Sequence, residues 1–173
     1  MNKRELNHLY TFRSIRPDEG YQAAEIERIC FPPQEACTQE RMLKRVSAAP
    51  ELFLTAEEKS TGRLAGFLNG IATDEEVFRD EFFTDIQLHN PKGRNVMLLG
   101  LDVLPQHRGQ GLASMLMEQY LGKEQRKGRK KIFLTCLPDK VKMYEKMGFK
   151  DHGLADSSWG GEQWHEMSCT INE

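Results

Sequence analysis

The sequence predicts an α/β fold in which helices cover both faces of a mixed, mostly antiparallel sheet. Two apolar runs, residues 52–56 and 64–71, flank the turn-rich link Lys59–Gly62, an order typical of an antiparallel hairpin. Two later apolar runs, residues 96–105 and 132–136, are each followed by a helical pattern. A strand that feeds a helix and then another strand predicts a right-handed crossover. Antiparallel pairing early in the chain and crossovers later therefore give a mixed sheet.

Length and composition indicate one soluble globular domain. The chain has 173 residues, 39% of them hydrophobic and 29% charged, so it can bury one full core but not two. We expect residues 1–10 to form a loose polar arm and residues 11–173 to form the domain. No apolar run approaches about 18 residues, and no signal-peptide pattern follows Met1. We therefore expect a cytoplasmic protein without a membrane partner.

Charge and cysteine usage exclude two further classes of function. A net charge of −2 provides no reason to expect nucleic acid as a partner. The four cysteines lack C-x-x-C spacing, and no cysteines and histidines cluster at ligand spacing, so we expect reduced, mostly buried thiols and no metal site. These cysteines are Cys30, Cys37, Cys136 and Cys169.

Two helices are predicted between a first strand, residues 11–15, and the hairpin. The first covers residues 17 to about 30, and the second begins after Thr38, whose hydroxyl is suited to cap it. The link Phe31–Pro33 cannot continue a helix, because proline lacks the N–H group. After the hairpin, the acidic segment 74–85 is either solvated surface or a source of carboxylates that attract a cationic amine.

Residues 96–119 carry the clearest functional signal. A buried strand feeds a helix through the glycine-bearing turn Arg108–Gly111. Unpaired N–H groups and the helix dipole make an anion site there, and Gly109 and Gly111 let a phosphate approach the main chain. No Walker A lysine follows, and Ser114 stands where a dinucleotide fingerprint needs its third glycine. The turn predicts a phosphorylated ligand of another kind.

A second strand and helix follow the first pair. The apolar run 132–136 leads to a helix that we expect to be capped by Asp139 and ended by Gly148 in the C′ position. Between the two motifs, the basic cluster within residues 123–131 is explained by a helix end whose cations face its own dipole, or by contact with a ribose phosphate.

Together, these motifs resemble the GNAT superfamily of N-acetyltransferases. Residues Arg108–Ala113 match its acetyl-CoA signature Gln/Arg-x-x-Gly-x-Gly/Ala, and Leu101–Pro105 looks like its pyrophosphate strand. Tyr144-x-x-x-Gly148-Phe149 is similar to the family's other hallmark, where the tyrosine lies beside the sulfur of coenzyme A. The resemblance implies the GNAT fold and acetyl-CoA as cosubstrate, without a metal. The cofactor-binding residues that it implies are Leu101, Asp102, Val103, Arg108, Gly109, Gln110, Gly111, Leu112, Ala113 and Ser114.

Over nearly the whole chain the sequence resembles one branch of that superfamily, the arylalkylamine (serotonin) N-acetyltransferases, which acetylate the primary amine of an arylalkylamine. That family has two histidines on its central strand, where this chain has Met97 and Leu99, neither of which can titrate. No general base is assigned, and the candidate carboxylates are Asp74, Glu75, Asp85 and Asp102. The matching segments are Phe12, Glu25–Arg28, Pro50–Leu52, Asp74–Glu76, Leu88–Gly93 and Glu166–Cys169.

The resemblance also suggests where the acceptor binds and how the sulfur leaves. In the GNAT fold the first two helices and their link form one wall of the acceptor pocket, so Phe31, Pro32 and Pro33 are candidate substrate contacts; a rigid helix connection explains them equally well. Tyr144 is the candidate catalytic acid, since a phenol of pKa about 10 can protonate a thiolate whose pKa is about 8.5.

We expect acetyl transfer to a small amine, aromatic or not, by direct attack in a ternary complex. The protein would work as a monomer or weak homodimer. Two alternatives stay open. One is acetylation of a protein lysine or N-terminal amine, and the other is a non-catalytic regulator that binds acetyl-CoA.

Overall fold

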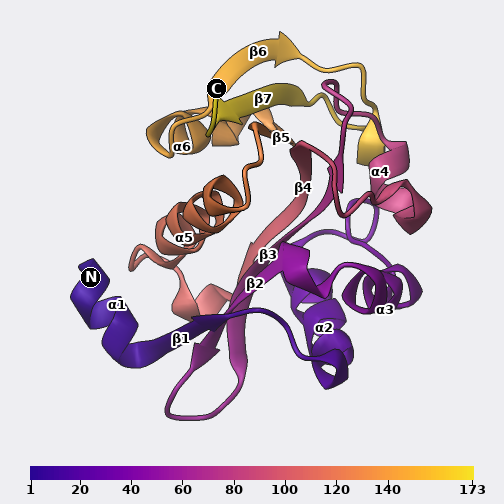
Figure 1. Ribbon diagram of the computed structural model, residues 1–173. Coiled ribbons are helices and arrows are strands. Elements are labelled where there is room, and N and C mark those ends of the chain that lie inside the picture. The colour runs from indigo at the N-terminus through magenta and orange to yellow at the C-terminus, as the bar shows by residue number, and fades with distance from the viewer. The chain divides into compact units, whose positions relative to one another are not determined.

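The computed structural model describes residues 1–173 and contains a seven-stranded sheet with the order β1-β2-β3-β4-β5-β7-β6 (Figure 1). β4 and β5 pair in parallel, whereas β1 with β2, β2 with β3, β5 with β7 and β6 with β7 pair antiparallel. The predicted α/β class with a mixed, mostly antiparallel sheet is therefore confirmed. The strands are β1 (Tyr10–Arg13), β2 (Phe53–Glu58), β3 (Leu64–Thr73), β4 (Asn95–Val103), β5 (Lys131–Cys136), β6 (Lys150–Leu154) and β7 (His165–Thr170).

Six α-helices are interspersed among these strands. Short 3₁₀ turns that begin with proline precede three of the helices, at Pro17–Glu19, Pro105–His107 and Pro138–Lys140. The α-helices are α1 (Lys3–Leu9), α2 (Gly20–Cys30), α3 (Gln39–Ala48), α4 (Glu81–Thr84), α5 (Leu112–Arg126) and α6 (Val141–Lys146).

The chain forms two compact units. The first contains residues 1–69 and 100–120, and the second contains residues 70–99 and 121–173. The long strands β3 and β4 contribute residues to both units, as does α5.

In the first unit, α2 and α3 pack on the hairpin β2–β3. Figure 1 shows both helices on one side of β1 and β2 and the start of α5 on the other. Apolar residues of α2 and α3 meet those of the hairpin in one core. Thr38 caps α3 by accepting a hydrogen bond from the N–H of Arg41 at 3.3 Å, which confirms its expected role. The core residues are Ile15, Ala23, Ala24, Ile26, Met42, Val46, Phe53, Leu64 and Phe67.

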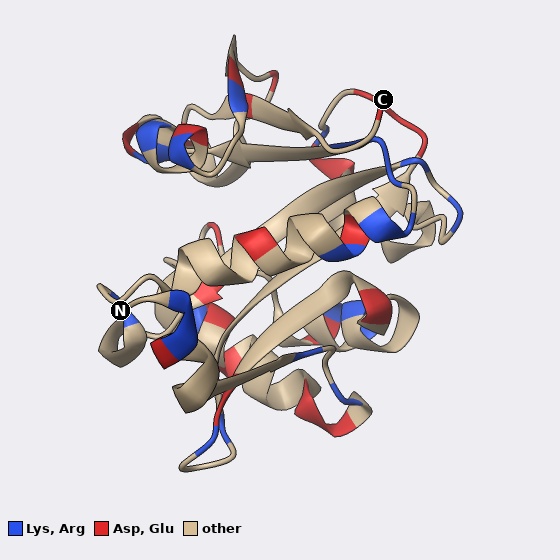
Figure 2. Ribbon diagram, turned by 60° about the vertical axis from the view of Figure 1, so that its left-hand side comes forward, with Lys and Arg blue, Asp and Glu red and all other residues tan.

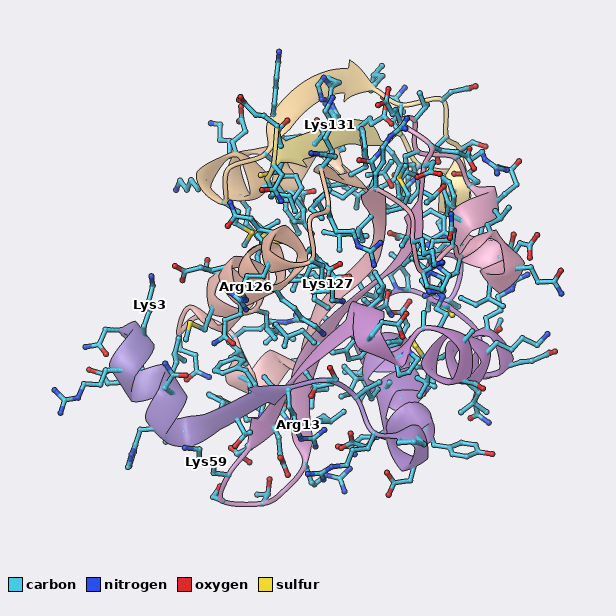
Figure 3. The ribbon with its side chains drawn as sticks, in the orientation of Figure 1. Lys3, Arg13, Lys59, Arg126, Lys127 and Lys131 are labelled. Atoms are coloured by element: carbon cyan, nitrogen blue, oxygen red, sulfur yellow. The ribbon has the colours of Figure 1, made fainter.

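Residues 3–9 form the helix α1, where the sequence suggested a loose arm. The side chain of Asn2 caps the helix by accepting from the N–H of Glu5 at 2.9 Å. Leu6 is 2% exposed, so one apolar side chain is sufficient to dock the short helix. Lys3, labelled at the start of α1 in Figure 3, forms an ion pair with Glu118 of α5. The sequence did not indicate this helix because its composition is polar, and all of its residues except Leu6 remain at the surface.

In the second unit, β5, β7 and β6 form an antiparallel group beside an apolar cluster. Met97 and Leu99 of β4 are buried in that cluster with Phe78, Phe82 and Phe133. The positions where the family that the sequence resembles carries histidines are therefore part of an apolar core. Methionine and leucine are suited to this environment, because a charged imidazole would lose its hydration there.

Two details of the second unit differ from the sequence-based expectation. The strand β6 was not predicted, because its side chains alternate between exposed and half-buried and it lacks an apolar run. Asp139 does not cap α6; it lies inside the 3₁₀ turn Pro138–Lys140, and Lys140 precedes the helix without a side-chain cap. Gly148 does follow the helix in the left-handed conformation, with φ of 100°, as predicted for the C′ position.

Candidate active site

The glycine turn joins β4 to α5 within the first unit. Gly109 and Gly111 have φ values of 78° and 92°, which only glycine adopts without strain. No heavy atom lies within 4 Å of the point where a side chain at Gly109 would begin, so a bound group can approach this main chain closely. At the start of α5, the first N–H group that donates to the carbonyl four residues earlier is that of Met115, which bonds to the Gly111 carbonyl at 3.1 Å. The preceding amides of Leu112 to Ser114 therefore lack such a carbonyl, which fits the phosphates of a coenzyme A ester.

Arg108 is an exposed residue whose side chain folds back onto the turn. Its Nε donates to the carbonyl of Val103 at 2.8 Å, so part of the guanidinium closes the turn against the end of β4. The thiol of Cys30 approaches the same carbonyl at 3.4 Å. Burial raises the pKa of Cys30, although the nearby Arg108 opposes that effect. The thiol therefore stays protonated at neutral pH and acts as a packing residue beside the turn.

A hydrogen-bond bracket holds the turn from β1. The hydroxyl of Tyr10, a residue only 4% exposed, lies 2.7 Å from Nδ1 of His107 and accepts from Nε2 of Gln110 at 2.5 Å. When the hydroxyl donates to Nδ1, the imidazole carries its proton on Nε2, which faces Glu58 at 3.9 Å. We call Tyr10, His107 and Gln110 the tyrosine bracket. It connects the start of the chain to both sides of the glycine turn.

Two buried carboxyl groups meet next to β4. Asp102 is 1% exposed and Glu27 of α2 is 4% exposed. Oδ1 of Asp102 and Oε1 of Glu27 lie 2.9 Å and 3.5 Å from the point where a side chain at Gly100 would begin. Both carboxyl groups therefore face the same part of the strand. The second oxygen of Glu27 accepts from the N–H of Cys37 at 2.8 Å and so anchors the link between α2 and α3.

Tyr144 lies on α6 in the second unit and is half-buried. Its ring meets Phe149 edge-on, with ring centroids 6.0 Å apart and an interplanar angle of 72°. The carbonyl of Tyr144 accepts from the N–H groups of Met147 and Phe149, both at 3.0 Å, as the chain reverses at Gly148. The ring is therefore held at the end of a short helix by packing and by backbone geometry.

Aromatic side chains gather around α4 in the same unit. Phe83 stacks on Trp159 with centroids 4.9 Å apart, and Phe83 also meets Phe78 at 5.2 Å. The N–H of Phe78 donates to Glu166 of β7 at 2.6 Å, and Ser157 donates to Asp80 at 2.6 Å. The acidic segment is thus tied to the segment before β7 by polar as well as aromatic contacts.

The charged residues are largely explained by local pairing. Figure 2 shows acidic and basic residues next to each other along α5. Glu75 accepts two hydrogen bonds from Arg79, both at 2.8 Å, so this carboxylate is already paired within the acidic segment. In the basic cluster, the buried Arg129 pairs with the fully buried Glu124 at 3.1 Å and therefore has a structural role. His, Cys, Asp and Glu side chains do not gather in groups of three or more that could hold a metal ion.

The sequence profile described as the Acetyltransferase (GNAT) family matches residues 20–149. The chain belongs to the GNAT acetyltransferase family. It is 30% identical over 164 residues to the serotonin N-acetyltransferase of Mesocricetus auratus, and the alignment covers 92% of this chain and 77% of that protein. The expected family and the expected enzyme class, an acetyl-CoA-dependent N-acetyltransferase, are confirmed by these matches.

Solved structures share the fold of this GNAT protein. The loading GNATL domain of CurA from Lyngbya majuscula has a TM-score of 0.80 at 17% identity, covering 94% of this chain and 98% of that chain. The putative acetyltransferase yncA from Salmonella typhimurium, solved with its cofactor acetyl-CoA, has a TM-score of 0.67 at 17% identity, covering 95% of each chain. The predicted GNAT fold is confirmed by these likenesses.

The predicted site residues of this GNAT acetyltransferase fall into three places. Leu101–Val103 end β4, and Arg108–Ser114 form the glycine turn and the first residues of α5, so both groups belong to one continuous segment. Tyr144 lies on α6. Phe31 is half-buried at the end of α2, where its N–H donates to the Glu27 carbonyl at 3.0 Å, while Pro32 and Pro33 are exposed.

Sequence reasoning missed Tyr10, His107 and Glu27. The only signal in the sequence was Asp102 itself, a carboxylate in an otherwise apolar strand, which implies a buried polar partner. Nothing local to Tyr10 or Glu27 indicates which residues they contact, since their partners lie about a hundred and about seventy-five residues further along the chain.

None of the helices is both long enough and apolar enough to cross a membrane.

Proposed function

We propose that the protein transfers the acetyl group of acetyl-CoA to the primary amine of a small acceptor by direct attack in a ternary complex. The observation that carries this proposal is the open main chain at Gly109, shortly before α5, in a chain that is 30% identical to a serotonin N-acetyltransferase. An aromatic amine is the first candidate acceptor, because that relative is named for one.

The cosubstrate would lie along the segment that joins β4 to α5. Acetyl-CoA supplies the activated thioester, and the amides near Gly109 and Gly111 are suited to its pyrophosphate. Main-chain N–H groups between Leu101 and Val103 are proposed to stabilise the negative charge that develops on the carbonyl oxygen. The remaining proposed contacts are Arg108, Gln110, Leu112, Ala113 and Ser114.

We assign the acid role to Tyr144. The Tyr144→Phe variant removes only the hydroxyl, so the edge-on contact with Phe149 can persist. Turnover should fall about 10- to 1,000-fold while the Kd of acetyl-CoA changes little, because the hydroxyl acts on the departing sulfur. Steady-state kinetics and calorimetry measure the two quantities. Tyr21→Phe is the matched control, since Tyr21 is 65% exposed on α2. Unchanged turnover in Tyr144→Phe would remove the acid role.

The acceptor is proposed to contact the link Phe31, Pro32 and Pro33. Phe31 is the best placed of the three to pack against an apolar amine, because its ring is half-buried while both prolines are exposed. Met97 and Leu99 lie in an apolar core and cannot remove a proton, so the reaction needs a proton acceptor elsewhere.

The deciding experiment mixes the protein with acetyl-CoA and a panel of amines and follows the release of free thiol. The panel contains arylalkylamines, polyamines, and peptides with lysine or a free N-terminus. Thiol release with small amines supports the proposal. Release with peptides alone would instead identify a protein acetyltransferase. Acetyl-CoA binding without release for any amine would indicate a non-catalytic regulator.

A further inference from the structure

The buried carboxyl groups of Asp102 and Glu27 have more hydrogen-bond acceptor atoms than the surrounding residues have donors for them. Both side-chain oxygens of Asp102 and Oε1 of Glu27 are buried without a hydrogen-bond partner. An unpaired buried polar atom costs about 1–3 kcal/mol, and more when it is charged. Two ionised carboxylates facing the same point at Gly100 would also repel each other. If the two groups share one proton, an acid O–H on Asp102 can donate to Oε1 of Glu27. That hydrogen bond gives buried oxygens a partner, and the shared proton removes the repulsion between two carboxylates.

The charged surroundings favour a single shared proton. Arg45 of α3 is 5% exposed, and its charge acts on Asp102. Desolvation disfavours two carboxylate charges at one buried point, so one carboxylate beside one carboxylic acid costs less to bury than two carboxylates. Burial, and then the negative charge of Glu27, raise the pKa of Asp102 well above its usual range. The other groups that face the pair are Cys30 of α2, Cys37 of the following link, and Arg108, which lies beside Cys30.

The strand beside the pair is less deeply buried than the rest of β4. Gly100 and Leu101 are half-buried, although the rest of β4 is buried, so the strand is most accessible next to the two carboxyl groups. An alkylammonium of pKa about 10.4 must lose a proton before it can attack, which costs about 4 kcal/mol at neutral pH. No histidine of β4 can accept that proton, because Met97 and Leu99 occupy the relevant positions.

We propose that Glu27 and Asp102, holding one proton between them, form the proton-accepting pair of the acetyl-transfer reaction. This inference rests on the proposed function. An N–H bond of the ammonium breaks, and its proton joins the Glu27 carboxylate. The nitrogen lone pair then forms the new N–C bond while the C–S bond breaks, and a second proton leaves the nitrogen and reaches the sulfur. Glu27 finally releases its proton to solvent.

Two near-isosteric variants test the pair through the pH profile of kcat/KM for the amine. Asp102→Asn keeps a donor toward Glu27 but cannot share a proton, and Glu27→Gln removes the accepting carboxylate. We expect each variant to lower kcat/KM about 100-fold and to shift or abolish the ascending limb of the profile, with an unchanged Kd for acetyl-CoA. The matched control is Glu25→Gln, because Glu25 lies on the same helix with its side chain 55% exposed in an ion pair with Arg28.

A second measurement does not depend on activity. Carbon NMR titration of the side-chain carboxyl groups should show one Asp signal that titrates above the usual range and disappears in Asp102→Asn. The absence of such a signal overturns the shared proton. If the wild type acetylates amines and both variants keep its pH profile, the accepting role is refuted while the proposed function stands. If the wild type acetylates no amine, both proposals fall. Circular dichroism establishes that each variant is folded.

Discussion

The tyrosine bracket provides a direct test of how the glycine turn is positioned. Tyr10→Phe removes one hydroxyl and keeps the buried ring. It eliminates the 2.7 Å contact with His107 and the 2.5 Å hydrogen bond from Gln110. A neutral hydrogen bond contributes about 0.5–1.5 kcal/mol, and His107 and Gln110 are half-buried, so water can partly replace the lost partner. The expected total cost is about 1–2 kcal/mol.

That cost should appear mainly in cosubstrate binding. In Tyr10→Phe the glycine turn loses two contacts that order it, so acetyl-CoA binding must order the turn instead. The Kd should therefore rise about 5- to 30-fold, since 1.4 kcal/mol corresponds to a factor of ten. Turnover at saturating acetyl-CoA should be nearly unchanged, because Tyr10 is not assigned a role in the chemical step. Titration calorimetry measures the Kd, and steady-state kinetics with the best amine of the panel measures turnover.

The control is again Tyr21→Phe, in which an exposed hydroxyl is removed from the same unit. The reasoning is refuted if Tyr10→Phe binds acetyl-CoA within about twofold of the wild type. It is also refuted if the variant loses turnover but not affinity, because the bracket would then act on the reaction and not on the turn.

Two further substitutions test the packing around the site by their effect on the free energy of unfolding, measured with urea. Gly66→Ala should destabilise the protein by about 1–3 kcal/mol, because the new methyl carbon would lie 2.3 Å from the main-chain oxygen of Asp102 and must displace a strand. A neutral result would mean that β3 and β4 can separate easily there. Arg129→Met should cost about 3–5 kcal/mol, since it leaves the fully buried Glu124 with Lys127 at 3.0 Å as its remaining cation and removes a hydrogen-bond donor to the Pro91 carbonyl. The double variant with Glu124→Gln should recover part of that loss, and no recovery would exclude the ion pair as the cause.

Local sequence patterns were sufficient to predict the elements that are determined by interactions between residues close together in the chain. The hairpin 53–73 follows from two apolar runs around a turn, and α5 from apolar spacings of three and four. Thr38 and Gly148 mark helix ends because a hydroxyl acceptor and a left-handed glycine each act within one helical turn.

Local patterns failed where stability comes from distant contacts. The helix α1 is polar except at Leu6, so its sequence resembles a loose arm until the rest of the unit covers that side chain. The strand β6 has no apolar alternation and exists because β7 supplies its hydrogen bonds. At α6, Asp139 follows the pattern of a cap, but the proline before it starts a 3₁₀ turn that moves the helix start to Val141.

The sequence by itself determined the family, the mixed sheet and the glycine turn, because these depend on residue order and spacing along a short stretch of chain. Only the tertiary structure decided that Asp102 meets Glu27 and that Tyr10 holds both sides of the turn. Those contacts join residues far apart in the chain, and no spacing rule predicts which buried polar groups must satisfy one another. The raised pKa of Asp102 follows from that meeting, since burial and a neighbouring charge act through space and not along the sequence.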